Sequence, residues 1–596
     1  MRLLPDRLVA TDLDGATLGT AVVDGSGSYQ LGPLQVDLDL DCDHAGLPAW
    51  SWSVANAGDR PVPVWSVGLV LRVEHTGPLR MFRHGYQSWS ACDVATLGIH
   101  EDPSHANSSG LELIQGVHHA DQRTAEPGEL RSEFVTVLAD ASVESGPFAT
   151  GALRVGFNGG VNHDGTFRLR LVDTGDTELT TEAFLGGARL DPGVRFVLHG
   201  ASTGSGAPAS AMLRDWARHV GMLGGARTTA PFQVGWCSWY HYFHGVTEAD
   251  LRSNLAASDA WPFDVFQLDD GFQAAIGDWL VTNDKFETDL AGLADAITTA
   301  GHTPGLWLAP FIAAPDARVL IDHPDWVATT RETGGPLPGM FNPPWEGGMG
   351  GLMFTLDTTH PGVLAHLEDL GRQVRDAGYD YLKLDFTFAP SFDGIYADPT
   401  MTPAQRVRAG YDAVRRGAGD DAFILGCGAP ISHVVGVIDG NRIGSDVDPR
   451  WTLDPDRADE AYPETLPATL HAFRNTLTRS FMHRALWLND PDCVMLRTTE
   501  TELDPAAVRT WARTVALSGG MVLVSDDLSL LGSDAHQLLD EVITLGRAVD
   551  AASLAMQPAR CDDLLDANPP TTLSAGGQQL VVDLTNGHGV LNGVPQ

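Results

Sequence analysis

The first 210 residues of the chain alternate short apolar stretches with turn-forming residues. In "YQLGPLQVDLDLD", "VWSVGLVLRVEH" and "VRFVLHG", apolar and polar positions alternate over most of the segment. Successive side chains of a strand leave on opposite faces, so each segment is predicted to be a strand with one buried face. Strands repeated at this spacing predict a β-sandwich over residues 1–210.

A different pattern joins this region to the rest of the chain. The segment "GASTGSGAPASAM" is rich in small and turn-forming residues and is predicted to be a linker. The overlapping segment "SAMLRDWARHVGML" has apolar residues at helical spacing and predicts a connecting helix. Residues 211–232 are therefore assigned to a linker with a connecting helix.

Between residues 233 and 527 the pattern changes to strand, helix, strand. Eight strand candidates, among them "FQVGWCSWY", "FDVFQLDD" and "YDYLKLDF", alternate with helical segments such as "PAQRVRAGYDAVRRGA". A (β/α)8 TIM barrel is the economical prediction. A doubly wound sheet is the alternative, although no glycine-rich phosphate turn follows the first strand. The tail, residues 528–596, is predicted to be a small C-terminal β region.

The charge of the chain narrows the class of ligand. There are 38 basic and 77 acidic residues, so the formal net charge is 38 − 77 = −39. This balance argues against nucleic acid or an anionic membrane as a partner and favours a small neutral or cationic ligand. Fifteen tryptophans add aromatic surfaces of the kind on which sugar rings stack, although most tryptophans serve packing.

The start of the chain and its cysteines indicate a compartment. The segment "MRLLPDRLVATDLDG" lacks the apolar region of a signal peptide, and no apolar run approaches the length of a membrane span. The six cysteines are scattered without a CxxC pair, which argues against disulfides and a cysteine-ligated metal. A cytoplasmic protein is expected.

Polar and aromatic residues follow nearly every strand candidate of the predicted barrel. The catalytic residues of TIM barrels lie at these carboxyl ends, so this distribution predicts an active site there. The alternative is that some aspartates cap the following helices, as expected for Asp527, or serve structure, as we assign Asp490 and Asp492. The candidates at the strand ends are Trp239, Tyr240, Asp269, Asp270, Trp307, Lys383, Asp385, Cys427, Arg442 and Asp446.

Lys383 and Asp385 are the most informative pair. They lie two residues apart in the apolar "YDYLKLDFTFAP", so both side chains leave the strand on the same face. A structural ion pair is one interpretation. The other is that the ammonium group of Lys383 keeps Asp385 ionised as a nucleophile. Trp239 and Tyr240 could likewise be core aromatics, and Cys427 a small buried apolar residue.

Several carboxylates with aromatic walls suit glycoside cleavage. This reaction uses one ionised carboxylate and one protonated carboxyl group on opposite sides of the scissile bond. A metal hydrolase would need histidine and carboxylate ligands, but "HYFH" and "VHHA" match no known ligand spacing. Neither a metal nor a cofactor is expected.

Six segments in sequence order carry a resemblance to a known family. The segments are "QVGWCSWYHYF", "FQLDDGFQAAIGDWLVTNDKF", "PGLWLAPFIA", "YLKLDFTFA", "FILGCGAPISHVVGVIDGNRIGSDVDPRW" and "LWLNDPDCVMLR". With them, the chain closely resembles glycoside hydrolase family 36, the bacterial α-galactosidases, over residues 233–527, and "HGYQSWS" resembles part of that family's N-terminal β-supersandwich. The resemblance implies a retaining exo-α-galactosidase acting on small galactosides.

The resemblance implies a role for each candidate. Asp385 matches the nucleophile and Asp446 the acid/base residue. Asp269 and Asp270 match the aspartates that bind galactose O4 and O6. Lys383 and Arg442 match residues that reach other hydroxyls of the sugar. The residues that match the lining of the pocket are Cys427, Trp239, Tyr240, Trp307 and Trp89, of which Trp89 closes one side.

One departure and several alternatives remain. Asp448, two residues after Asp446, is a second acid where similar sequences have small uncharged residues, so the preference for the leaving group is open. An α-N-acetylgalactosaminidase and a transglycosylase of the raffinose-synthase type are the alternative enzymes. A non-catalytic sugar-binding relative is the alternative of another class, but binding alone needs neither Asp385 nor Asp446. The sequence leaves the oligomeric state open.

Overall fold

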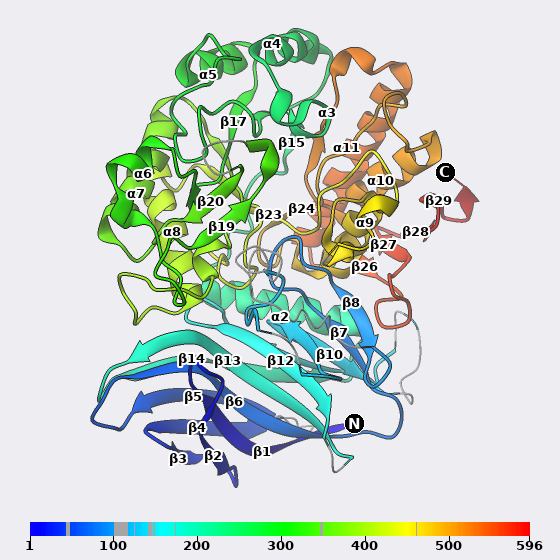
Figure 1. The fold of residues 1–596 in the computed structure, drawn as a ribbon. Helices are drawn as coiled ribbons and strands as arrows, with labels where there is room; N and C mark the ends of the chain where they lie inside the picture. The colour runs from blue at the N-terminus through cyan, green and yellow to red at the C-terminus, as the bar shows by residue number, and fades with distance from the viewer. Residues whose placement is uncertain are drawn as a thin grey trace.

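A computed structural model describes most of the chain. It covers a β-rich N-terminal region, a barrel surrounded by helices and a small C-terminal sheet (Figure 1). No helix of this described part has the length and apolar composition needed to cross a membrane. The described residues are 1–42, 48–100, 117–123, 126–140, 146, 149–172, 175–345, 350–460 and 462–595.

The N-terminal region contains two antiparallel sheets, which confirms the predicted β architecture. Their inward apolar side chains belong to one buried cluster. The first sheet has the strand order β2 (Thr17–Val22), β1 (Arg2–Thr11), β6 (Val62–Glu74), β13 (Thr177–Leu190), β12 (Asp164–Leu171), β9 (Leu130–Glu133). The second has the order β3 (Gly27–Leu31), β4 (Leu34–Cys42), β5 (Pro48–Asn56), β14 (Arg195–Ser205), β11 (Leu153–Phe157), β10 (Val135–Ala139), β7 (Arg80–Arg83), β8 (Asp93–Thr96).

The connecting helix is α2 (Ala209–Gly224), which lies between the N-terminal sheets and the barrel (Figure 1). It buries Leu213, Trp216, Ala217 and Val220, which recur at helical spacing. The prediction of a helix at this point is confirmed.

Eight parallel strands form the central sheet, and they follow one another in chain order. The first strand pairs with both the second and the last, and the N–H of Met521 donates to the carbonyl oxygen of Asn489 (2.9 Å) where the last two strands meet. The barrel is closed, which excludes the doubly wound alternative. The strands are β15 (Val234–Cys237), β16 (Val265–Leu268), β17 (Thr303–Leu308), β21 (Tyr381–Leu384), β22 (Phe423–Gly426), β23 (Gly440–Arg442), β24 (Leu488–Asp490) and β25 (Val522–Val524).

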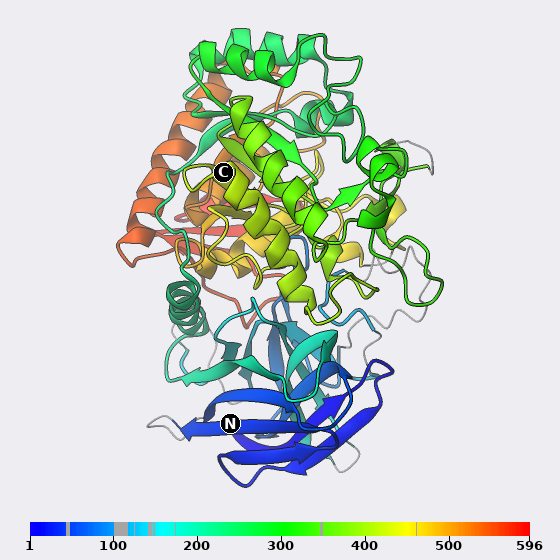
Figure 2. The ribbon, with the colours of Figure 1, turned by 90° about the vertical axis from the view of Figure 1, so that its left-hand side faces the viewer.

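Helices cover the outside of the barrel (Figure 2). Two of them approach so closely that a side chain at Gly417 would meet the carbonyl oxygen of Glu368 at 1.8 Å. Residues 427–439, all described, form turns and no helix between β22 and β23. The helices are α3 (Trp239–Tyr242), α4 (Glu248–Ala257), α5 (Leu290–Thr299), α6 (Arg318–Asp322), α7 (Pro361–Asp376), α8 (Pro403–Ala418), α9 (Thr469–Thr478), α10 (Pro505–Ser518) and α11 (Ser533–Leu554).

Two further sheets complete the fold. The insertion between β17 and α7 holds β18 (Ile312–Ala313), β19 (Pro338–Phe341) and β20 (Leu352–Thr355). The C-terminal sheet contains β26 (Arg560–Cys561), β27 (Thr572–Ala575), β28 (Gln578–Asp583), β29 (His588–Leu591) and β30 (Val594–Pro595).

The C-terminal region differs from the prediction in one respect. The predicted β region holds a long helix, α11, before its first strand. Its buried residues Leu539, Val542, Ile543 and Val549 have the helical period, so the signal was present in the sequence but was not recognised.

The loop between β7 and β8 docks onto the carboxyl end of the barrel. The guanidinium group of Arg479, just after α9, donates to the carbonyl oxygens of Ser88 (2.6 Å), Gly85 (2.9 Å) and Gln87 (3.1 Å). It also donates to the carbonyl oxygen of Ile443 after β23 (3.0 Å). One fully buried cation therefore joins the N-terminal loop to the barrel.

We expect Arg479→Met to destabilise the protein by at least about 3 kcal/mol, because several buried carbonyl groups lose their donor at once. Urea unfolding measures this loss. The matched control is Arg416→Met, which removes an exposed ion pair with Glu368 and should change stability by less than about 1 kcal/mol. Equal effects of the two substitutions would contradict the role given to Arg479.

Candidate active site

A cavity of ≈ 660 Å³ lies at the carboxyl ends of the barrel strands. Strand ends, the insertion after β17, the loop after β23 and the N-terminal region all contribute to its walls. The lining residues are Trp89, Val117, His118, Trp239, Asp269, Asp270, Trp307, Met340, Phe341, Asn342, Pro343, Trp345, Lys383, Asp385, Phe386, Phe388, Asp446, Arg457, Glu460, Thr465, Leu466 and Pro467.

Most of the residues expected at the site border this cavity. Eight of the eleven do so: Trp89, Trp239, Asp269, Asp270, Trp307, Lys383, Asp385 and Asp446. The other three, Tyr240, Cys427 and Arg442, are buried and do not line it. A direct contact between these three and a sugar therefore stays a prediction.

Lys383 pairs with a different residue from the one expected. Its ammonium group donates to Asp269 Oδ2 at 2.9 Å, across the barrel from β21 to the end of β16. Asp385 shares the strand face of Lys383 but receives its hydrogen bonds from other donors. Asp269 follows β16, which is separated from β21 by β17. The sequence places Lys383 and Asp385 on one face but cannot predict that a strand two places away supplies the carboxylate.

Asp385 has a donor for each of its carboxylate oxygens. The indole N–H of Trp307 donates to Oδ2 at 3.0 Å, and the backbone N–H of Phe386 donates to Oδ1 at 2.8 Å. Phe386 has a φ of 51°, the left-handed region that costs energy for a residue other than glycine. Burial raises the pKa of Asp385, while the charge of Lys383 and the Trp307 bond oppose the rise.

Asp269 and Asp270 end strand β16 with different surroundings. Asp269 holds Lys383 and accepts the N–H of Asp270 at 2.9 Å. Asp270 accepts from the indole of Trp345 and from the amide of Gln273, each at 2.7 Å. Burial raises the pKa of Asp270 to about 6, although these two donors oppose the rise.

Arg442, at the end of β23, binds several carboxylates. Its Nη1 is 2.8 Å from Asp446 Oδ1 and 2.7 Å from Asp492 Oδ2, and its Nε is 3.3 Å from Asp490 Oδ2. The hydroxyl of Tyr240 also donates to Asp492. The expectation that Asp490 and Asp492 serve structure agrees with these contacts, since neither lines the cavity.

Two other aspartates have local roles. Asp527 caps the short helix Leu528–Leu530 by accepting the N–H of Ser529 at 2.9 Å, as predicted. Asp448 accepts the N–H of Arg450 at 3.0 Å and does not line the cavity. Asp448, the residue at which the chain departs from similar sequences, therefore stabilises a turn.

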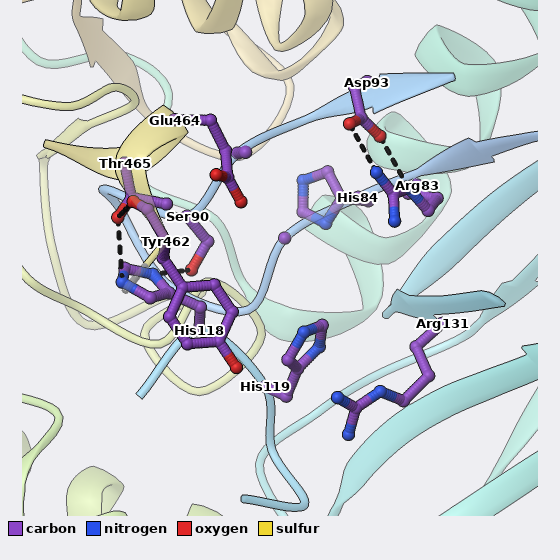
Figure 3. A pocket seen from close by; sticks show the side chains of 12 residues that line it. Arg83, His84, Ser90, Asp93, His118, His119, Arg131, Tyr462, Glu464 and Thr465 are labelled. Atoms are coloured by element: carbon purple, nitrogen blue, oxygen red, sulfur yellow. Dashed lines mark hydrogen bonds and ion pairs between the residues drawn. The ribbon is translucent and has the colours of Figure 1, made fainter. Parts of the chain in front are cut away.

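The N-terminal region supplies one wall of the cavity. Trp89 packs edge-on against Phe386, with ring centroids 5.1 Å apart. His118 lies between Ser90 and Thr465 and is 3.1 Å from both hydroxyl oxygens (Figure 3). Behind it lies a smaller pocket of ≈ 50 Å³, bordered by residues of both regions. The imidazole thus joins the N-terminal region to the barrel loop after β23.

The sequence analysis missed the residues that reach the cavity from loops. Trp345 follows β19 in the insertion, where no strand or helix period marks a site. Its tryptophan identity within "PPW" was the only signal. Within the described part of the chain, no group of three or more histidine, cysteine or acidic side chains is arranged to hold a metal ion.

Comparisons with known proteins relate this chain to α-galactosidases. The sequence model of the Melibiase family matches residues 235–386. The α-galactosidase AgaA of Geobacillus stearothermophilus is 35% identical over 81 residues, 13% of this chain and 11% of that protein. The chain thus matches only a small part of this curated relative. An A type blood α-D-galactosamine galactosaminidase of Flavonifractor plautii is 26% identical over 178 residues, 29% of this chain and 16% of that protein.

A solved structure aligns over nearly the whole chain. TtGalA, an α-galactosidase from Thermus thermophilus in complex with p-nitrophenyl α-D-galactopyranoside, is 26% identical with a TM-score of 0.67. The alignment covers 93% of this chain and 99% of that one. The structure of AgaA, at 12% identity and a TM-score of 0.59, shares the fold over 98% of this chain and 80% of its own.

The raised pKa of Asp270 predicts how stability depends on pH. Between the ordinary pKa of 3.8 and the folded value of about 6, the unfolded chain loses its proton first, so stability falls as pH rises through this window. At pH 7 the cost is on the order of 3 kcal/mol. We expect Asp270→Asn to be more stable than the wild type at pH 7 but not at pH 4, as measured by urea unfolding.

Asp269→Asn is the matched control for this prediction. It leaves the buried ammonium group of Lys383 without its carboxylate and should destabilise the protein at pH 7. A stability difference between Asp270→Asn and wild type that is the same at both pH values would contradict the prediction.

Proposed function

Because the chain belongs to the melibiase family of α-galactosidases, which are glycoside hydrolases, we propose that it is a retaining exo-α-galactosidase. It would remove terminal α-D-galactosyl residues from small galactosides by double displacement. The observation that carries the proposal is that Asp385 and Asp446, from β21 and from just after β23, border one cavity in different environments.

The two environments suit different roles. Asp385 is buried and accepts two neutral N–H donors, which hold its oxygens in place without neutralising their charge. The side chain of Asp446 is 32% exposed, so it can reach the leaving group and then water. These differences support Asp385 as the nucleophile and Asp446 as the acid/base residue.

In the first step, a carboxylate oxygen of Asp385 attacks the anomeric carbon of the galactosyl residue. The bond from this carbon to the leaving oxygen breaks, and Asp446 gives its proton to that oxygen. A glycosyl ester on Asp385 results. The fixed donors Trp307 and Phe386 position the attacking carboxylate before the reaction begins.

In the second step, Asp446 acts as a base. It takes a proton from water, and the water oxygen attacks the anomeric carbon of the ester. The Asp385 carboxylate leaves, its negative charge stabilised by the same two N–H donors. Two inversions give retention of the α-configuration.

Recognition of the sugar is assigned to the end of β16. Galactose differs from glucose in the orientation of one hydroxyl, and carboxylates accept hydroxyl hydrogen bonds strongly. Asp269, held by Lys383, and Asp270, held by Trp345 and Gln273, are fixed at the cavity wall. Their fixed orientation supports a role in binding O4 and O6.

The comparisons support a small galactoside as the substrate. Structures of TtGalA contain p-nitrophenyl α-D-galactopyranoside and stachyose. The net charge of −39 also favours a neutral ligand over an anionic one. Cys92, Cys237, Cys427, Cys493 and Cys561 are buried, free thiols, which supports a cytoplasmic location.

One alternative substrate has a specific observation in its favour. The match to an α-D-galactosamine galactosaminidase means that α-galactosaminides belong in the test set, beside the α-N-acetylgalactosaminides that the sequence analysis left open. A panel of aryl α-glycosides carrying galactose, galactosamine, N-acetylgalactosamine and glucose separates these substrates. Turnover of the galactoside alone agrees with the proposal, whereas preference for either amino sugar would replace it. Raffinose with and without a second sugar acceptor separates hydrolysis from transglycosylation.

We expect Asp385→Ala to reduce turnover of aryl α-galactosides by at least about 10⁴-fold, since this substitution removes the nucleophile. Added azide should restore activity by attacking the anomeric carbon from the vacated side, and the product should be a β-galactosyl azide, identified by NMR. Near-wild-type hydrolysis by this variant would assign the nucleophile to another residue.

Asp269→Asn and Asp270→Asn are each expected to lower galactoside turnover by orders of magnitude. Each substitution removes a carboxylate that accepts a hydrogen bond from a sugar hydroxyl, and a site built to bind one hydroxyl depends strongly on that bond. If Asp270 served only to shape the turn after β16, Asp270→Asn would have little effect on turnover. Asp269→Asn also leaves Lys383 unpaired, so its turnover must be read beside its stability. Steady-state kinetics with p-nitrophenyl α-galactoside, compared with melting curves, tells the two roles apart. Unchanged kinetics in both variants would remove the pair from sugar recognition.

A further inference from the structure

One nitrogen of Arg442 lies between two carboxylates. Its Nη1 is 2.8 Å from Asp446 Oδ1 and 2.7 Å from Asp492 Oδ2. Nη1 donates to Asp446 Oδ1 and, at 3.4 Å, to the hydroxyl oxygen of Tyr240, whose own hydrogen goes to Asp492. Asp492 therefore holds the guanidinium group beside Asp446 in two ways, by the ion pair and through Tyr240.

Asp492 is placed where it cannot touch a substrate. Its side chain is fully buried, whereas that of Asp446 is 32% exposed. It does not border the cavity that Asp446 lines. Any effect of Asp492 on the reaction must act through the groups that it holds.

Asp492 also fixes the backbone beside Asp446. Its Oδ2 accepts the N–H of Val447 at 2.8 Å and the hydroxyl hydrogen of Tyr240. Its Oδ1 accepts the N–H of Cys493 at 2.7 Å. One carboxylate thus holds the guanidinium group in contact with Asp446 and the peptide that follows Asp446 in the chain.

The backbone at Asp492 is strained. Its φ of 94° lies in the left-handed region, which is unfavourable for residues other than glycine. Such a conformation persists where the surrounding contacts determine it, and it is most frequent at functional sites. The contacts around this backbone are those of the carboxylate with Arg442, Val447 and Cys493.

We propose that Asp492 is a positioning residue for the general acid, holding Arg442 and Val447 so that Asp446 presents its second oxygen to the leaving group. Arg442 occupies Asp446 Oδ1, which leaves Oδ2 as the oxygen that carries the proton to be donated. The inference rests on the proposed function, because it assumes that Asp446 donates a proton.

Asparagine at position 492 cannot keep this arrangement. With its oxygen in place of Oδ2, its NH₂ group meets the N–H of Cys493; in the opposite orientation it meets the donors on Val447, Tyr240 and Arg442. In either case donor faces donor, and the guanidinium group loses its fixed direction.

The test is a series of aryl α-galactosides with leaving groups of increasing basicity, from dinitrophenyl to phenyl. Good leaving groups need little proton donation, whereas phenol needs much. We expect Asp492→Asn to lower kcat/KM for the phenyl galactoside at least about tenfold more than for the dinitrophenyl galactoside. Asp446→Ala, measured in the same series, gives the limiting dependence on the leaving group.

Asp526→Asn is the matched control. Asp526 is also a fully buried aspartate after a barrel strand, 2.7 Å from the guanidinium of Arg497, and it accepts the N–H of Leu496. The side-chain contacts of Asp526 go to Arg497 and Leu496, and none of them reaches Asp446 or Val447. Its substitution should lower stability without steepening the dependence on the leaving group.

Tyr240→Phe keeps the charge of Asp492 and removes one of its donors, so it should steepen the dependence slightly and in the same direction. This variant decides the question if Asp492→Asn does not fold. If the wild type is active and both variants lose kcat/KM equally for all leaving groups, the inference is overturned. A wild type that hydrolyses no galactoside of the series would overturn the proposed function, and the inference with it.

Discussion

The site depends on the burial of two cations among more carboxyl groups than they can neutralise. A buried charge is costly unless it is paired, so the position of each cation determines which carboxyl groups are ionised at low cost. Lys383 is paired with Asp269, and Arg442 with the carboxylates after β23 and β24. The carboxyl groups concerned are Asp269, Asp270, Asp385, Asp446, Asp490 and Asp492.

The unequal pairing separates the pKa values of the site. Asp270, whose donors are neutral, has a pKa raised by burial to about 6. Burial also raises the pKa of Asp492, although the neighbouring Arg442 opposes the rise. The carboxyl groups around the cavity therefore differ in how readily they carry a charge. The surrounding fold supports these environments, because the loop between β7 and β8, which Arg479 holds, and the insertion after β17 cover the carboxyl end of the barrel.

Much of this arrangement could be predicted from the sequence, and the reason is the period of the barrel. Parallel strands bring their carboxyl ends together, so Asp269, Lys383 and Asp385 could be assigned to one site from their positions alone. What the sequence could not give is which residues pair. The strand period determines the face on which a side chain lies, but the partner of Lys383 comes from the end of β16, two strands away, and depends on the side-chain rotamers.

Contributions from outside the strands were less predictable for the same reason. Trp345 reaches Asp270 from an insertion whose path no local pattern determines. The role of Asp492 was hidden because its position after β24 is equally typical of a structural aspartate. Trp89 was predicted at the site from the resemblance of its loop to a known family rather than from its period.

The nucleophile and the acid are held by different kinds of donor, and this difference follows from what each must do. Asp385 loses its charge when the ester forms and regains it when the ester breaks. Neutral N–H donors from Trp307 and Phe386 can stay in place through both changes, since they are not left as unpaired charges. Asp446 changes its charge in the opposite sense, so a cation beside it must keep another partner whenever Asp446 is neutral. Asp490 and Asp492 both lie within ion-pair distance of Arg442, so the guanidinium group keeps other partners when Asp446 is neutral.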